Sequence, residues 1–144
     1  MSGPGDGASV EMPAWRRTTG VLAGLTAAAA TVGSVQLLTG TFTPPVSDLR
    51  PLGLDSWALP GLALAASVAV PCAATAVLSW RRSRWMGPAA IGAGSLLAVE
   101  LMVQLPFVGR DPLQGVMAVV AASLVGIGWS SARRSGMTGR PAPS

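Results

Sequence analysis

The stretch GPAAIGAGSLLAVELMVQLPFV, at residues 87–108, decides the fold class of this chain. It carries one ionisable side chain, Glu100, and it is long enough to cross the roughly 30 Å hydrocarbon core of a bilayer as an α-helix. Over the whole chain of 144 residues, 50% are hydrophobic and 11% are charged. Because a soluble domain carries about 25% charged residues, the apolar excess here has no place in water. The sequence therefore predicts an integral membrane protein.

Three further apolar runs have a similar length. Proline falls in the first turn of two spans, at Pro60 and Pro88, where its missing N–H costs no hydrogen bond. Asp111-Pro112 is typical of a helix start, whereas Pro71 lies inside a run and should kink the helix or leave a carbonyl for a neighbour to satisfy. The predicted fold is all-α, a membrane-embedded four-helix bundle with spans at about 18–39, 59–80, 87–108 and 113–131.

Polar segments flank and interrupt these spans. Residues 1–14 and 135–144 are rich in Gly, Pro and Ser, so we expect a disordered cytoplasmic arm and a disordered cytoplasmic tail. The transmembrane domain is then residues 15–134. Inside it, the stretch from Thr41 to Ser56 combines prolines with charged side chains and cannot lie in lipid. It is predicted to be an aqueous loop.

The arginines predict the orientation. All ten basic residues are arginine, and eight lie beside one end of the spans: Arg16, Arg17, Arg81, Arg82, Arg84, Arg133, Arg134 and Arg140. Basic residues gather on the cytoplasmic side of a membrane, so both termini are expected in the cytoplasm, with the chain spanning the bacterial inner (plasma) membrane several times. The absence of Lys and the bias toward Ala, Arg, Gly and Pro are typical of a bacterial genome rich in G and C.

One alternative concerns the first span. Arg16-Arg17 followed by an Ala-rich run loosely matches a twin-arginine export signal, and Ala28–Ala30 could form a small-residue cleavage site. Cleavage there would leave three spans in the mature protein.

Missing residue types exclude many activities. The chain has no His and no Tyr, and Cys72 is its single Cys, so His-based acid–base chemistry, His/Cys metal sites and internal disulfides are excluded. Phosphate-binding loops and nucleophile motifs are also absent from the sequence. We expect no catalytic residue, no metal and no cofactor. The arginines cluster at span ends instead of forming a basic stripe, so nucleic acid is not an expected partner.

Polar residues inside the spans are the candidate site. With a rise of about 1.5 Å per residue, Glu100 lies about 4 Å to the outer side of the span centre, level with Thr31 and Ser67. Gln36, Gln104 and Gln114 lie about 10–12 Å toward the same side. An acid at this depth is expected to face protein or water. These six residues either hydrogen-bond between helices as structural contacts, or line a polar cavity that binds a proton, a cation or a small polar ligand.

Three function classes remain open. The lack of catalytic residues favours a non-enzymatic accessory or scaffold subunit of an inner-membrane assembly, docked through small-residue pairs at Gly20/Gly24 or Gly92/Gly94, which could also join two copies of the chain. The alternative is a small proton- or cation-coupled transporter, or a ligand-binding membrane protein, that uses Glu100. An enzyme acting on a lipid or prenyl substrate would need paired acids or a metal site near the interface, and only Asp48, Asp55 and Asp111 are candidates, so it is the weakest of the three.

Short motifs between Trp57 and Trp129, about half of the chain, carry a family resemblance. They are Leu59–Leu62 (LPGL), the Arg- and Trp-containing turn Arg81–Trp85, Val103–Gly109 (VQLPFVG) and Leu113-Gln114. In these motifs the chain resembles a family of small uncharacterised bacterial membrane proteins with four transmembrane helices. The resemblance implies the four-span topology and no particular activity.

Overall fold

The computed structural model describes residues 12–41, 45–108 and 112–137, and every regular element in these ranges is helical. Four segments of this part are long and apolar enough to cross a membrane. They are α1 (Ala14–Thr39), the continuous run of α2 (Ala58–Leu64), η2 (Ala65–Ala69) and α3 (Val70–Trp80), then α4 (Met86–Val108) and α5 (Pro112–Met137). The prediction of an all-α fold built from four such segments is therefore confirmed for the described ranges.

Two helices extend beyond their predicted spans, α1 at its start and α5 at its end. α1 begins at Ala14, before the predicted residue 18, and ends as expected at Thr39, where Gly40 adopts a left-handed conformation (φ 68°) that stops the helix. α5 continues to Met137, beyond the predicted residue 131. Arg134 in its last turn complements the negative end of the helix dipole, and no proline interrupts this stretch. The predicted Asp111 cap lies outside the described residues.

A π-helical turn precedes Pro71 in the second segment. A proline inside a helix cannot donate a backbone hydrogen bond, and its ring crowds the carbonyl of the residue four positions earlier, here Ser67. The helix widens into the π-helical turn η2 just before it, where the N–H of Val70 donates to the carbonyl of Ala65. Helix α3 then resumes with Pro71 in its first turn. The π turn displaces the side chains of α2 around the axis relative to those of α3.

The loop predicted at Thr41–Ser56 contains a short 3₁₀ helix, η1 (Val46–Leu52), that the sequence analysis did not anticipate. Gly53 ends it with a left-handed conformation (φ 65°) and donates its N–H to the carbonyl of Arg50 at 3.1 Å. Leu49 is buried at 2% exposure, so an apolar side chain anchors this otherwise polar connection.

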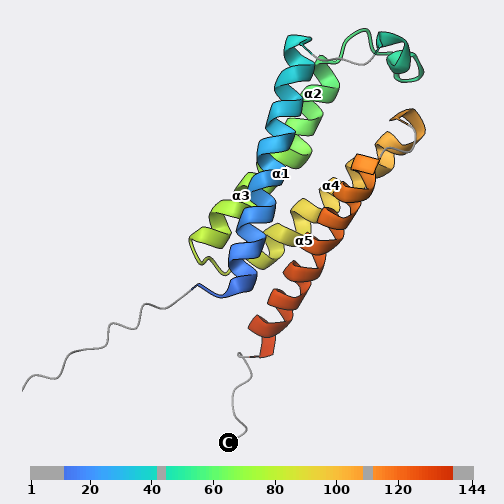
Figure 1. Ribbon diagram of the computed structural model, residues 1–144. Helices are drawn as coiled ribbons and strands as arrows, with labels where there is room; N and C mark the ends of the chain where they lie inside the picture. Colours follow the sequence, from blue (N-terminus) through green and yellow to red (C-terminus); the bar gives the residue numbers. More distant parts are fainter. Residues whose placement is uncertain (1–11, 42–44, 109–111, 138–144) are drawn as a thin grey trace, which may run out of the picture.

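The four segments form two helical hairpins (Figure 1). We call the pair of α1 with α2–η2–α3 the first hairpin, and the pair of α4 with α5 the second. Within each hairpin the helices pack along much of their length, and the two hairpins meet mainly where η2 and α3 lie against α4. Small side chains dominate the buried core: Ala23, Ala27, Ala30, Val68, Ala69, Cys72, Ala93, Leu97, Ala121 and Leu124.

Two glycines of the predicted docking pairs are used inside the chain. A Cβ at Gly20 would lie 3.1 Å from Nε1 of Trp80, and a Cβ at Gly94 would lie 2.8 Å from the carbonyl oxygen of Ala121. These positions therefore join α1 to α3 and α4 to α5, and are not surfaces for a partner. Gly92, by contrast, has no neighbour within 4 Å among the described residues.

The outer faces of all four segments carry large apolar side chains. Exposed examples are Leu25 on α1, Val70 on α3, Met102 on α4 and Val119 on α5. At most a third of the most apolar window of any segment is buried inside the bundle. This outward apolar surface is what a helix bundle in a lipid environment would present.

Candidate ligand cavity around Glu100

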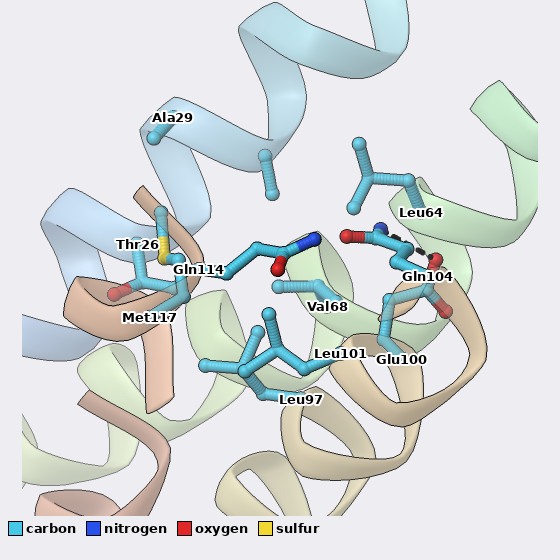
Figure 2. Close-up of a pocket in the computed structure, with 11 residues that line it drawn as sticks. Thr26, Ala29, Leu64, Val68, Leu97, Glu100, Leu101, Gln104, Gln114 and Met117 are labelled. Carbon is cyan, nitrogen blue, oxygen red and sulfur yellow. Dashed lines mark hydrogen bonds between the residues drawn. The ribbon is translucent and has the colours of Figure 1, made fainter. Parts of the chain in front are cut away.

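A cavity of about 310 Å³ lies between the two hairpins (Figure 2). All four segments contribute to its wall. The residues that line it are Thr26, Ala29 and Ala30 of α1, Leu64 and Val68 of the second segment, Leu97, Glu100, Leu101 and Gln104 of α4, and Gln114 and Met117 of α5. Below, this space is called the Glu100 cavity.

The Glu100 carboxyl is held by two neighbours. Nε2 of Gln104, one turn further along α4, donates to Oε1 of Glu100 at 3.3 Å. Oγ of Ser67, on η2, contacts Oε2 of Glu100 at the same distance. The Ser67 contact links the two hairpins through the acid, and the two contacts together orient the Glu100 side chain at the wall of the cavity.

Ser67 has one hydroxyl hydrogen and two oxygen neighbours. Its Oγ lies 2.7 Å from the carbonyl of Ala63 and 3.3 Å from Oε2 of Glu100. When Glu100 is ionised, its oxygen competes with the Ala63 carbonyl for that hydrogen. When Glu100 is protonated, the acid can donate to Oγ while Ser67 donates to Ala63. Ser67 can therefore hydrogen-bond to the Glu100 carboxyl either as donor or as acceptor.

Gln114 supplies an unused donor. Its Nε2 is buried and has no hydrogen-bond partner among the described residues. In Figure 2 the Gln114 amide points across the cavity toward the amide of Gln104. An unpaired buried amide costs about 1–3 kcal/mol, so a structure that keeps one in a cavity gains when an acceptor reaches it.

The remaining wall is apolar, formed largely by aliphatic side chains and Met117. Ligand sites in proteins share this composition: a mostly apolar pocket with a few convergent polar groups, and a volume of about 300–1,000 Å³. The Glu100 cavity is at the small end of that range. Its carboxyl and amides can orient the polar end of a ligand while the aliphatic wall contacts an apolar body.

The six predicted site residues separate into two groups. Glu100, Gln104 and Gln114 line the cavity, and Ser67 contacts Glu100 from beside it. Thr31 and Gln36 do not join them, since both are exposed on α1 and neither lines the cavity. Thr31 uses its hydroxyl on the Ala27 carbonyl of its own helix, at 2.8 Å. These two predicted residues therefore do not belong to the Glu100 cavity, and their role as site residues stays a prediction.

Thr31 and Gln36 lie outside the cavity because of the rotation of α1 about its axis. Depth along the axis follows from residue number, but the side of α1 that faces the cavity is set by Thr26, Ala29 and Ala30. Thr31 follows Ala30 by one residue, which turns it about 100° away. The sequence analysis missed Thr26. It lies three and four residues before Ala29 and Ala30, a spacing that puts all three on one face of the helix. Its hydroxyl donates to the Leu22 carbonyl at 2.9 Å.

The part of the chain that the structure describes holds no group of three or more His, Cys, Asp or Glu arranged to bind a metal ion. In comparisons with known proteins, no family model, no curated protein and no solved structure matches this chain. The family resemblance noted from the sequence stays a prediction. Function must therefore be argued from the cavity itself.

Proposed function

We propose that the chain is a multi-pass protein of the bacterial inner membrane, with both termini in the cytoplasm. Four long apolar helices with exposed aliphatic side chains support membrane embedding. Arg16, Arg81 and Arg134 lie at one end of the bundle, where α1 begins and α3 and α5 end, and Arg50 lies in the connection at the opposite end. This asymmetry favours the cytoplasm for the arginine-rich end.

Reporter fusions test this topology. A cytoplasmic reporter fused after Ser144 should be active, and an exported reporter inserted in the connection between Thr41 and Ser56 should also be active. As a matched control, the two reporters are exchanged, and both should then be silent. An active exported reporter after Ser144 would contradict the proposed orientation.

Within this membrane protein, the Glu100 cavity binds a small amphiphilic molecule that carries an ammonium group. The observation that carries the proposal is the Glu100 carboxyl, held by Gln104 and Ser67 at the wall of an otherwise apolar cavity. Glu100 offers carboxyl oxygens to a cationic donor, and this attraction is strong where water is excluded. An apolar ligand body fills the space between Leu97, Leu101 and Val68.

Two probes of similar shape test the cavity. The 2-phenylethylammonium ion carries the cationic head, whereas 2-phenylethanol has the same ring without the charge. Binding of each to the purified protein is measured by calorimetry. Glu100→Gln keeps a hydrogen-bonding side chain of the same size, so we expect it to weaken ammonium binding about tenfold or more while changing alcohol binding little.

Gln36→Leu is the matched control, because Gln36 is an exposed amide on α1 outside the cavity. It should leave both probes unchanged. Equal binding of the ammonium probe to wild-type protein and to Glu100→Gln, with both proteins folded, would refute the ligand proposal.

A second function has its own support, that of an accessory subunit. α5 is the least buried of the four segments, and one face of it carries a row of exposed small residues at four-residue spacing: Ala118, Ala122, Gly126 and Ser130. Such a row lets another transmembrane helix approach closely. A specific subunit that co-purifies in mild detergent should be lost with Gly126→Leu and retained with Gly92→Leu, an equally exposed glycine on α4. A monomer without partners under these conditions would argue against this role.

A further inference from the structure

A second cavity lies at the arginine-rich end of the bundle, far along the helices from Glu100. Its volume is about 370 Å³. It opens where α1 begins, α4 begins and α5 approaches its end, which is the lower end of the molecule in Figure 1. Its lining residues are Trp15, Arg16, Ser83, Arg84, Met86, Gly87, Pro88, Ser131, Ala132 and Arg134. We call it the arginine cavity.

Three separate elements each bring one arginine to this space. Arg16 comes from α1, Arg84 from the turn between α3 and α4, and Arg134 from α5. None of the described residues that line the cavity is acidic. Three like charges around one space repel each other, and an anion between them removes this cost.

Arg16 is already positioned for such a role. Its Nη2 donates to the Ser83 carbonyl at 2.9 Å and its Nη1 to the Ser79 carbonyl at 3.5 Å. The guanidinium also lies over the Trp15 ring, 5.3 Å from the centroid. A guanidinium has five N–H donors, so these two bonds fix its plane and leave three for a ligand.

The start of α4 adds to the positive field. Met86 is its first residue, and Met86, Gly87 and Pro88 all line the arginine cavity. The first turn of a helix is the positive end of its dipole, although here the N–H of Met86 already donates to the Ser83 carbonyl at 3.4 Å and Pro88 has no N–H. Gly87 is buried against the carbonyl of Gly128, so the backbone there lies close to α5 without a side chain between them.

We infer that the arginine cavity is a binding site for a phosphate group, held by Arg16, Arg84 and Arg134. Guanidinium groups match the geometry of phosphate oxygens and pair with two at once. Trp15 at the wall and Trp85 beside it place the cavity at the depth of lipid headgroups if the bundle lies in a membrane. The phosphate then belongs either to an anionic lipid or to a soluble phosphate ester.

The neighbouring arginines provide a matched control. Arg133 and Arg81 are exposed at the same end of the bundle and do not line the cavity. The Arg84→Gln/Arg134→Gln double variant and the Arg81→Gln/Arg133→Gln double variant lose the same charge. Arg84 and Arg134 are exposed side chains, so neither change opens the core. Circular dichroism and thermal unfolding of each variant confirm that it is folded.

The experiment measures binding of three probes to the full chain in an uncharged detergent. Phosphatidylglycerol and phosphatidylcholine are followed by native mass spectrometry, and glycerol 3-phosphate by calorimetry. Wild-type protein should bind phosphatidylglycerol more tightly than phosphatidylcholine, and the Arg84→Gln/Arg134→Gln variant should lose about tenfold or more of this affinity. The control variant should stay close to wild type.

The soluble probe identifies the source of the phosphate. Binding of glycerol 3-phosphate with the same dependence on Arg84 and Arg134 points to a soluble ester, and binding of phosphatidylglycerol alone points to a lipid. Equal losses in the two double variants would show general charge attraction and overturn the site. Absence of binding by both anionic probes to wild-type protein would overturn it as well. If the double variant unfolds, Arg134→Gln against Arg133→Gln gives the same comparison with one change each.

Discussion

The contact within the second hairpin and the contact between the two hairpins are built in opposite ways. Where α4 meets α5, Gly94 and Gly128 bring the backbones so close that a Cβ would lie 2.8 Å from a carbonyl oxygen at each position. Where the hairpins face each other near Glu100, the same bundle leaves a cavity of about 310 Å³. One interface has no room for a methyl group, and the other has room for a small molecule.

This difference separates stability from function. Close contact maximises dispersion attraction between helices, which drives their association when lipid replaces water. A cavity gives up such contacts, and buried amides without partners add a further cost. The α4–α5 contact is therefore the more closely packed of the two, and the junction of the hairpins is where packing is lost around the candidate site.

Alanine at the tight interface should have the largest effect. Gly94→Ala places a methyl group 2.8 Å from both the Ala121 carbonyl and Cγ2 of Val125, so the helices must separate. We expect a loss of about 1–3 kcal/mol in the free energy of unfolding. Gly92→Ala is the control, because its Cβ meets nothing within 4 Å among the described residues.

In soluble helices alanine is favoured over glycine by about 1 kcal/mol, so Gly92→Ala should be neutral or stabilising. The two substitutions should therefore shift the unfolding temperature in opposite directions, or at least by clearly different amounts. A similar shift for both would mean that α4 and α5 are not in such close contact.

Filling the cavity should affect binding more than stability. Ala30→Leu extends an aliphatic side chain into the Glu100 cavity, where space exists, and should weaken binding of 2-phenylethylammonium about tenfold. The change in unfolding temperature should be small or positive. Ala28→Leu, on the exposed side of α1, is the control for the added bulk. If Ala30→Leu binds the probe as wild type does, the ligand occupies some other place.

Removing the unpartnered amide should have the smallest measurable effect. Gln114→Leu eliminates a buried donor without a partner, so the ligand-free protein should become more stable by about 1 kcal/mol. Gln36→Leu, at an exposed position, should change stability by less than about 0.5 kcal/mol. Thermal unfolding of the two variants side by side gives the comparison. A clear destabilisation by Gln114→Leu would show that the amide has a structural partner.

Whether α1 remains on the mature protein can be tested on the wild-type chain. Seven residues of α1 are buried in the bundle, so the first span acts as part of the fold and we expect it to remain on the mature chain. Intact-mass measurement of protein purified from membranes checks this. A loss of about 30 residues would instead support the export-signal alternative.

Much of the fold could be predicted because it depends on local properties. The apolar runs, the prolines at Pro60, Pro71 and Pro112, and Gly40 after α1 follow from side-chain chemistry over short stretches of sequence. The extension of α5 to Met137 was missed because polar residues past the end of a span can continue a helix when nothing breaks it.

The candidate site shows where prediction from sequence stops. Glu100, Gln104 and Gln114 line one cavity, and their positions along the helices could be calculated because the rise per residue of a helix is fixed by its backbone hydrogen bonds. Thr31 was placed at the same level and yet lies on the exposed side of α1. Rotation of a helix about its axis depends on which side chains its neighbours accept.

The sequence by itself therefore determined the helical segments, their apolar character and the position of each polar group along its helix. Tertiary structure alone decided that Gly94 packs against α5 whereas Gly92 has no neighbour within 4 Å among the described residues. It also decided that the Gln114 amide points toward Gln104 across the cavity, whereas Gln36 does not line it. The physical reason is that helix length and rise come from local bonding, whereas the facing of each helix comes from packing between segments distant in sequence.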